Sequence, residues 1–472
     1  MANAAEPDPA TQPPSSGEFF GHPRGLFVLF LTEMWERFSY YGMRSLLVLY
    51  MVNYLFIHPD VGQRVLGFTA VKGFLEGMYG PLAPQPLSSL IYGLYTGLVY
   101  FTPFFGGMLA DRLLGQRRTV VVGGVLMAIG HFLMASERLF FPALMFLILG
   151  NGCFKPNIST QVGLLYRPGD MRRDRGFSIF YVGINLGAFL APLVCGTLGQ
   201  TVGWHYGFAA AGVGMVLGLV FYLLNQKHLA PDVLAQRKRD QQRSGAKTEP
   251  FTREEWLRVT AIVVVCGIVA AFWAVYEQQG NTLQLWADTN TLWTFFGLNV
   301  PSTWYQAFNP FMIWIFTPVL TMLWSWQRAR NQEPSSLTKM AIGCVLLGVG
   351  FIVMISAAQG LTDPTMKRSI LWLVGSTVIY TFGELYLSPI GLSFVTKVAP
   401  VRIVSMMMGV WFLANFIGNY MTGYLGTFYE RMPKTQFFTL MTTIGVVAGV
   451  VLFIIGRPLD KIVSKHDKQE AH

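Results

Sequence analysis

Four charged side chains interrupt the apolar stretch FVLFLTEMWERFSYYGMRSLLVLYMV: Glu33, Glu36, Arg37 and Arg44. On a helix that turns by about 100° per residue, these side chains and Tyr40 fall within an arc of about 100°, with Tyr41 beside it. A charge at the centre of a membrane helix costs at least ~2.5–3.5 kcal/mol. The polar stripe therefore predicts a wet interior cavity on this side of the helix. The alternative is a set of ion pairs that locks helices together.

Three further charged side chains lie deep in apolar stretches. Lys155 is in GNGCFKPNISTQVG, Glu277 in AFWAVYEQQGNT and Glu384 in YTFGELYLSPIG. With the first stretch, the interior would hold four acids and three bases, so one acid can be left to bind a proton. Burial and a nearby cation act on the proton affinity of a carboxylate in opposite directions. An exchange of ion-pair partners can therefore couple proton movement to conformation.

Uncharged polar and aromatic residues accompany these charges. Asn185 in FYVGINLGAF and Asn309 in YQAFNPFM are expected to face the cavity, or else to hold helices together by hydrogen bonds. Tyr95 and Trp411 are expected to form cavity walls, although aromatic residues at helical spacing more often belong to the core.

Membrane helices must position these residues. The chain has 472 residues, of which 52% are apolar and 13% charged, whereas soluble domains carry about 25% charged residues. A helix needs about 20 mostly apolar residues to cross a bilayer. Twelve such spans are predicted, at approximately 26–55, 88–110, 118–136, 141–165, 176–198, 206–225, 256–285, 303–326, 337–358, 370–397, 401–427 and 436–456.

The basic residues indicate how the chain is oriented. If the N-terminus is cytoplasmic, most of the 35 Lys and Arg lie in cytoplasmic segments such as DRLLGQRR and RPGDMRRDR. Cytoplasmic loops carry such an excess, so both termini are predicted to be cytoplasmic. This bias explains the formal net charge of +10 without a nucleic-acid partner. No basic region followed by an apolar stretch marks the N-terminus as a cleaved signal.

The segment NQKHLAPDVLAQRKRDQQRSGAKTEPFTREE divides the predicted spans six and six. Two halves joined by a polar linker are typical of secondary transporters. The predicted fold is an all-α polytopic membrane protein with two six-helix bundles around a central cavity. Its predicted parts are a disordered cytoplasmic tail (1–20), the first bundle (21–225), a cytoplasmic linker (226–255), the second bundle (256–457) and a cytoplasmic tail (458–472).

Several motifs together resemble those of the proton-dependent oligopeptide transporter (POT) family of the major facilitator superfamily. They are EMWERFSYYGMR, which matches the ExxER pattern, FYVGINLGAFLAP, FKPNIST, EQQG and GELYLSPIG. GGMLADRLLGQRR resembles a cytoplasmic loop motif of the superfamily, and it would stabilise one access state through Asp111, Arg112, Arg117 and Arg118. The resemblance extends from about Gly21 to Arg457. Many bacterial relatives carry two additional helices between the bundles, but the polar linker here favours twelve spans.

The resemblance implies a role for each candidate residue. Proton coupling is expected of Glu33, Glu36, Arg37 and Glu277. Glu277 would also form a gate with Arg44. The carboxylate of a bound peptide is expected to contact Arg37 and Lys155, and its ammonium group Glu384, Asn185 and Asn309. The peptide backbone would lie along Tyr40, Tyr41 and Tyr95, with Trp411 forming part of a side-chain pocket.

The implied function is the import of di- and tripeptides with protons by alternating access. The resemblance further implies a multi-pass monomer in the inner membrane, with protons as coupling ion, no other cofactor, and peptides and lipid as partners. One alternative is the same fold carrying nitrate or another small metabolite. A membrane enzyme is disfavoured because no nucleophile–His–acid set or metal cluster is visible in the sequence. A channel is disfavoured because buried charges suit occluded binding.

Overall fold

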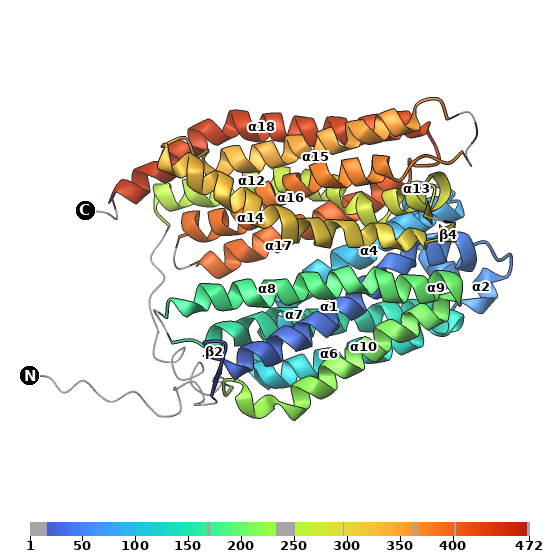
Figure 1. Cartoon of the computed structure of the whole chain (residues 1–472), viewed down its shortest axis with the longest axis horizontal. Coiled ribbons are helices and arrows are strands. Elements are labelled where there is room, and N and C mark those ends of the chain that lie inside the picture. Colours follow the sequence, from blue (N-terminus) through green and yellow to red (C-terminus); the bar gives the residue numbers. More distant parts are fainter. Residues whose placement is uncertain are drawn as a thin grey trace, which may run out of the picture. The chain divides into compact units, whose positions relative to one another are not determined.

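A computed structural model describes residues 17–167, 170–232, 251–295, 297–361, 363, 366–400 and 403–469. Long helices joined by short turns make up most of this part of the chain (Figure 1). Residues 1–16 of the predicted N-terminal tail and residues 233–250 of the predicted linker lie outside the described residues.

The helices follow the predicted spans closely. Those before the linker are α1 (Arg24–Tyr50), α2 (Val61–Arg64), α3 (Phe68–Tyr79), α4 (Pro84–Phe101), α5 (Pro103–Leu109), α6 (Gln116–Leu133), α7 (Phe140–Leu164), α8 (Arg172–Ala191), α9 (Thr197–Thr201) and α10 (Trp204–Leu224). Those after it are α12 (Arg253–Tyr276), α13 (Thr282–Asn290), α14 (Phe308–Ala329), α15 (Ser336–Ala358), α16 (Leu371–Val398), α17 (Val404–Gly426) and α18 (Lys434–Gln469).

Short elements complete the chain. Two hairpins pair β1 (Glu18–Phe19) with β2 (His22–Pro23) and β3 (Thr294–Phe295) with β4 (Leu298–Asn299). Single π-helical turns cover Met51–Leu55, Ala110–Leu114 and Pro192–Gly196. Single 3-10 turns cover Glu137–Leu139, Gln226–His228, Glu277–Gly280 and Ser302–Ala307.

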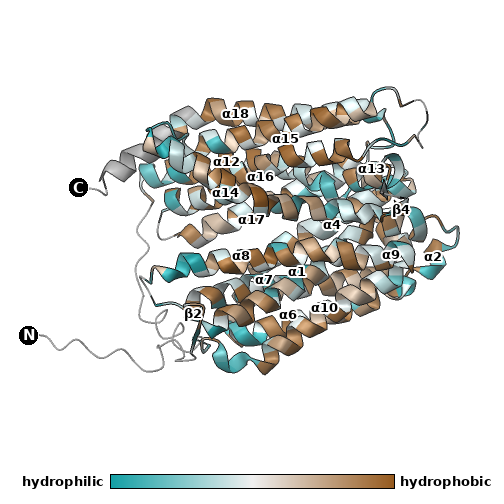
Figure 2. Cartoon of the chain, viewed as in Figure 1, coloured by the Kyte–Doolittle hydropathy of each residue, from teal (hydrophilic) through white to brown (hydrophobic). Residues whose placement is uncertain are grey.

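Eight helical segments in the described part of the chain are long and apolar enough to cross a membrane: Glu137–Leu164, Arg172–Thr201, Trp204–Leu224, Arg253–Asn290, Ser302–Ala329, Ser336–Ala358, Leu371–Val398 and Lys434–Gly456. Figure 2 shows hydrophobic residues along much of α15 and α18. The other four predicted spans coincide with α1, α4–α5, α6 and α17. Helix α1 carries all four charges of the ExxER stripe. The count of twelve spans stays a prediction.

Some elements were not anticipated from the sequence. The segment between the first two predicted spans contains α2 and α3, and α3 buries Phe68 and Leu75 on one face. The last helix, α18, continues to Gln469 through the predicted C-terminal tail. Short amphipathic helices and helix extensions lack the long apolar run on which the span prediction depends.

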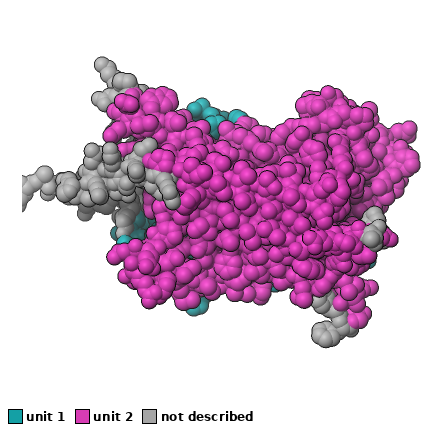
Figure 3. Space-filling view, turned by 90° about the horizontal axis from the view of Figure 1, so that it is seen from above, with its two compact units in different colours: residues 1–43, 102–247 teal, residues 44–101, 248–472 magenta. Residues whose placement is uncertain are grey.

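Two compact units can be distinguished by their internal packing, and Figure 3 colours them separately. Unit 1 comprises residues 1–43 and 102–247. Within it, α8 approaches α1 so closely that a Cβ on Gly187 would lie 2.2 Å from the Met34 carbonyl oxygen. Only glycine fits at this crossing, which fixes the turn of α1 that carries the ExxER residues.

Unit 2 comprises residues 44–101 and 248–472. In it, α4 packs directly on α17, and a Cβ on Gly93 would lie 2.6 Å from the Gly423 Cα atom. The end of α1 and the whole of α4 therefore pack with helices from the second half of the chain. The predicted bundles, 21–225 and 256–457, are continuous stretches of the sequence. The two units instead group the segments that pack against one another. The division into bundles stays a prediction.

A charged cluster closes the turn between α14 and α15 in unit 2. Glu333 accepts hydrogen bonds from Arg328 Nε and Lys339 Nζ, each at 2.6 Å. The Lys339 ammonium also lies 4.4 Å from the centre of the Trp324 ring. Hydrogen bonds from Arg328 and Lys339 lower the pKa of Glu333 from 4.5 to about 2. The carboxylate is thus the shared partner of two bases.

We expect Glu333→Gln to lower the thermal stability of the detergent-solubilised protein at pH 7. Lys339 is only 6% exposed, and a buried donor left without its charged partner costs ~1–3 kcal/mol. Because the folded-state pKa of Glu333 is depressed, its stabilisation is complete above pH 4.5 and is lost as the pH falls towards about 2. The melting temperature, measured from pH 7 to pH 3, checks both effects. The exposed Glu430 provides the control: Glu430→Gln should leave this pH dependence unchanged.

Candidate functional site

Arg37 is held by two buried acids of its own helix, α1. Its Nε and Nη2 atoms donate to the two carboxylate oxygens of Glu36 at 2.5 and 2.7 Å. Glu33, one turn earlier, places Oε1 3.2 Å from the same Nε atom. The three side chains are at most 4% exposed. The ExxER pattern therefore forms one buried cluster in unit 1, in which two acids share one base.

Helix α7 brings an amide and a second base to this cluster. Asn151 Nδ2 lies 3.3 Å from Glu36 Oε1, and Lys155, one turn later on α7, interacts electrostatically with Glu33. The predicted association of Lys155 with the ExxER residues is thus present within unit 1. The cluster of unit 1 thus contains two acids, one base in direct contact with them and a second base that acts on Glu33 through its charge.

Aromatic side chains of α1 extend the stripe beyond Arg37. The Arg37 Cζ atom lies 5.2 Å from the centre of the Tyr40 ring, a cation–π arrangement that favours the charged base. The rings of Tyr40 and Tyr41 meet edge to face at 5.1 Å. Asn185, on α8, donates from Nδ2 to the Tyr181 carbonyl of its own helix at 3.0 Å. The structure thus places these predicted peptide-lining residues in unit 1.

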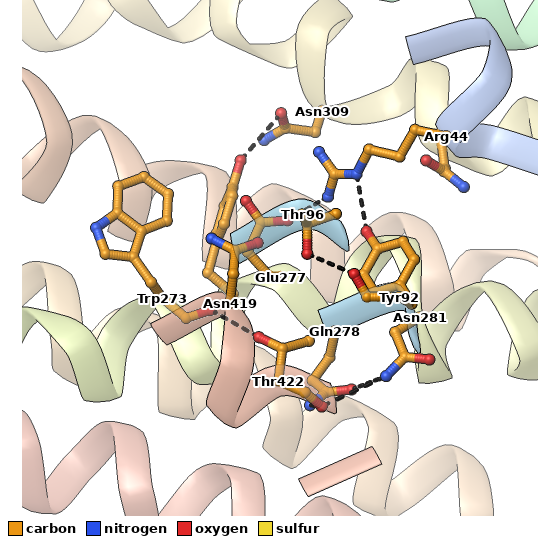
Figure 4. A network of polar contacts seen from close by, with 12 residues as sticks. Arg44, Tyr92, Thr96, Trp273, Glu277, Gln278, Asn281, Asn309, Asn419 and Thr422 are labelled. Carbon is orange, nitrogen blue, oxygen red and sulfur yellow. Dashed lines mark hydrogen bonds and ion pairs between the residues drawn. The ribbon is translucent and has the colours of Figure 1, made fainter. Parts of the chain in front are cut away.

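Arg44 forms a buried ion pair with Glu277 in unit 2 (Figure 4). The end of α1 supplies the base, and the turn that follows α12 supplies the acid. Arg44 Nε donates to the Tyr92 hydroxyl at 2.8 Å. Arg44 and Glu277 are 4% and 2% exposed. The predicted pairing of Arg44 with Glu277 is confirmed, and Tyr92 of α4 is an additional partner.

The glycine of the EQQG motif makes room for this ion pair. A Cβ on Gly280 would lie 2.0 Å from the Tyr92 hydroxyl and 3.0 Å from Arg44 Nη2. Helix α12 ends at Tyr276, and the next four residues form a 3-10 turn. The turn presents Glu277 to Arg44, and the absent side chain at Gly280 leaves space for Tyr92.

A lattice of buried amides and hydroxyls lies next to the ion pair (Figure 4). Gln278 Nε2 donates to the Thr422 carbonyl at 3.1 Å. Ser89 donates to Asn281 Oδ1 at 2.9 Å, and Gln85 donates to Ser89 at 2.8 Å. These contacts join α4 and α17 to the turn after α12. The Arg44–Glu277 pair therefore lies beside a buried hydrogen-bond network within unit 2.

Glu384 is held by a second polar cluster in unit 2. Asn309 Nδ2 donates to Glu384 Oε2 at 2.8 Å and to the Thr381 hydroxyl at 3.1 Å. The Tyr276 hydroxyl donates to Asn309 Oδ1 at 3.3 Å. The structure thus brings together the predicted ammonium ligands Glu384 and Asn309. The amide holds the acid in place.

The two predicted wall residues are also in unit 2 and are deeply buried. Tyr95, on α4, and Trp411, on α17, are each 2% exposed. Trp411 packs on α16, where a Cβ on Gly391 would lie 2.1 Å from its Cη2 atom. This contact shows that Trp411 packs between helices. Its role in a substrate pocket stays a prediction.

In the GGMLADRLLGQRR loop, Asp111 and Arg112 are exposed and lie in a π-helical turn. Gln116 and Arg117, which follow in the same motif, contact the segment after α10. Arg117 Nε donates to the Ala230 carbonyl at 2.8 Å, and Asp232 accepts from the Gln116 amide at 2.7 Å. The loop therefore anchors the start of the linker, and the gating role of Asp111 and Arg112 stays a prediction.

Sequence reasoning missed three residues of these clusters: Tyr92, Tyr276 and Asn151. Tyr92 precedes Tyr95 by three residues, Tyr276 directly precedes EQQG, and Asn151 precedes Lys155 by four residues. Positions one turn away from a charged or predicted site residue share its helix face, and this signal could have found Tyr92 and Asn151. In the described residues, no group of three or more His, Cys, Asp or Glu side chains is arranged to hold a metal ion.

Comparison with known proteins identifies the family. The model of the POT family matches residues 117–244 and 241–447. The chain is 35% identical to the uncharacterized transporter YclF of Bacillus subtilis, over 93% of this chain and 94% of that protein. It is 33% identical to a di-/tripeptide transporter of Lactococcus lactis subsp. cremoris, over 94% of this chain and 97% of that protein.

A solved structure agrees over the same length. The crystal structure of a peptide transporter POT in complex with sulfate is 34% identical, with a TM-score of 0.81, and the match covers 96% of this chain and 98% of that one. These relatives confirm an all-α polytopic membrane fold of the major facilitator type. The chain belongs to the POT family.

Proposed function

We propose that this protein is a proton-coupled symporter that imports di- and tripeptides by alternating access. The observation that carries this proposal is the pair of buried polar clusters. One contains Arg37 and Lys155 with two acids, and the other contains Glu384 held by Asn309. They occur in a chain whose relatives include a di-/tripeptide transporter.

The chemistry of the clusters suits a zwitterionic substrate. Any short peptide has a carboxylate at one end and an ammonium group at the other, whatever its side chains. Arg37 and Lys155 would bind the carboxylate, and Glu384 with Asn309 would bind the ammonium group. Binding both ends selects for length, whereas apolar walls tolerate varied side chains.

Proton coupling would use the competition between substrate and acids for Arg37. When a proton neutralises an acid of the ExxER cluster, Arg37 loses part of its attraction to that acid and becomes available to the peptide carboxylate. When the proton leaves, the acid again attracts Arg37, and the hold on the peptide weakens. Uptake and release of the proton would thus accompany binding and release of the peptide.

Alternating access would use the Arg44–Glu277 pair as a gate. The pair joins the end of α1 to the turn after α12, and the α4–α17 contact lies within the same unit. Protonation of Glu277 would remove its attraction for Arg44 and allow the end of α1 to separate from the turn after α12. The protein would act as a monomer in the inner membrane, with both termini in the cytoplasm.

Uptake by proteoliposomes tests the proposed function. With an inward proton gradient, the protein should accumulate labelled dialanine, and an uncoupler should abolish the accumulation. Excess unlabelled di- and tripeptides should compete, whereas free alanine and nitrate should not. Competition by nitrate without competition by dialanine would favour the alternative of a nitrate carrier. Uptake that neither saturates nor supports counterflow would favour a channel.

A further inference from the structure

Asn151 is a buried amide that donates a hydrogen bond in the ExxER cluster. None of the roles predicted from the sequence includes this contact. Its side chain is 0% exposed, and its Nδ2 atom lies 3.3 Å from Glu36 Oε1. Its Oδ1 atom is buried and has no hydrogen-bond partner within the described residues. A buried polar atom without a partner costs free energy. The contact from Nδ2 to Glu36 is therefore the one that favours an amide at this position.

A second amide on the same helix shows the contrast. Asn157 is 3% exposed, and its Nδ2 atom donates to the carbonyls of Cys153 and Gly106 at 2.7 and 3.3 Å. Asn157 therefore bonds to the backbone of α7 and α5. Asn151 bonds instead to a carboxylate, and the contact joins α7 to the acid that holds Arg37.

The two acids of the cluster are held differently. Glu36 accepts two hydrogen bonds from Arg37 and one from Asn151. Glu33 contacts Arg37 through Oε1, and its Oε2 atom is buried without a hydrogen-bond partner in the described part of the chain. Donors directed at a carboxylate favour its ionised form. Asn151 thus contributes to the difference between two acids that lie on the same helix face.

We propose that Asn151 is a positioning residue, which holds the Glu36 carboxylate against Arg37. This inference rests on the proposed proton coupling. The charged or titratable groups bearing on the cluster from the described helices are Glu33, Arg37, Tyr40 and Tyr41 on α1 and Lys155 on α7. Among these neighbours, Asn151 supplies a donor that carries no charge, so it stabilises Glu36 without competing for the peptide carboxylate.

Asn151→Leu tests the proposal because leucine has a similar volume and lacks the donor. The pH midpoint of gradient-driven dialanine uptake should move by about one pH unit to higher pH, because the cluster loses a neutral donor that favours the charged form of a carboxylate. In the Glu36→Gln background, Asn151→Leu should cause no further shift. Counterflow of dialanine at equal pH on both sides should persist, which shows that the variant is folded and binds peptide.

Asn157→Leu is the matched control. It removes an equally buried amide of α7 and should leave the pH midpoint unchanged, even where the uptake rate falls. An unchanged midpoint in Asn151→Leu, or an equal shift in Asn157→Leu, would overturn the proposal. If Asn151→Leu shows no counterflow, the smaller Asn151→Ala decides: it also removes the donor and should move the midpoint in the same direction. If the wild-type protein shows no gradient-driven uptake, the proposed function itself fails, which is a distinct result.

Discussion

Glu277→Gln is expected to abolish the accumulation of peptide against a gradient while preserving counterflow. Glutamine has the shape of the protonated acid, so the variant would permanently lack the ion pair between residue 277 and Arg44. Glutamine cannot take up or release a proton, so we expect gradient-driven uptake to fall to the level of liposomes without protein. The measurements are uptake of labelled dialanine with an imposed proton gradient and counterflow without one, in the same proteoliposomes.

Asp288→Asn provides the matched control for this change. Asp288, on α13, accepts hydrogen bonds through its carboxylate from Ser302 at 2.6 Å and Asn53 at 3.0 Å, and its backbone carbonyl accepts one from Lys367 at 3.1 Å. Its replacement neutralises an acid of unit 2 without affecting the Arg44 pair, and uptake should remain close to that of the wild type. Accumulation by Glu277→Gln at the wild-type rate and pH dependence would exclude Glu277 from coupling.

The charged residues of the site could be predicted from the sequence because burial of a charge in a membrane is costly. Every acid and base that interrupts an apolar span needs a partner or a wet cavity. This reasoning, together with the family motifs, selected Arg37, Glu277 and Glu384, and the structure places each in a polar cluster. The spans were predictable for a related reason, because long apolar runs mark helices whatever their neighbours are.

Details of pairing could not be predicted in this way. Helical angles place Glu33 and Glu36 on one face with Arg37, but only side-chain geometry shows that Glu36 makes both short hydrogen bonds. Tyr92 resembles any aromatic core residue in sequence, and its contact with Arg44 depends on the missing side chain of Gly280. Helical spacing can point to such a residue, but it does not show which distant segment the residue contacts.

The packing units illustrate the same limit. The even division of apolar spans around a polar linker predicted two halves, but residues 44–101 pack with the second half of the chain. Close contacts such as the one at Gly93 and Gly423 depend on the conformation that the chain adopts. Hydropathy predicts which segments form helical spans, but it does not predict which spans are in contact in a given state.

Glu384→Gln is expected to raise the KM for dialanine by ~10- to 150-fold, because a hydrogen bond to a charged group contributes ~1.5–3 kcal/mol. Asn309 would still bond to the new amide, so the cluster should stay intact while its negative charge is lost. The measurement is the concentration dependence of counterflow, which separates binding from proton coupling. Lys155→Met, at the other end of the proposed peptide contact, should raise the KM by a similar factor.

Modified substrates show which end of the peptide each residue binds. Propionyl-alanine, which lacks the amino group of dialanine, should compete poorly with dialanine in the wild type and should lose no further affinity in Glu384→Gln. Dialanine amide retains the amino group and lacks the carboxylate, so it should lose affinity in Glu384→Gln and none in Lys155→Met. Equal losses for propionyl-alanine and dialanine amide in Glu384→Gln would show that Glu384 acts on the fold of the cluster and does not bind the ammonium group. The crossed pattern, by contrast, requires a direct contact, because a general loss of structure cannot distinguish the two ends of the peptide.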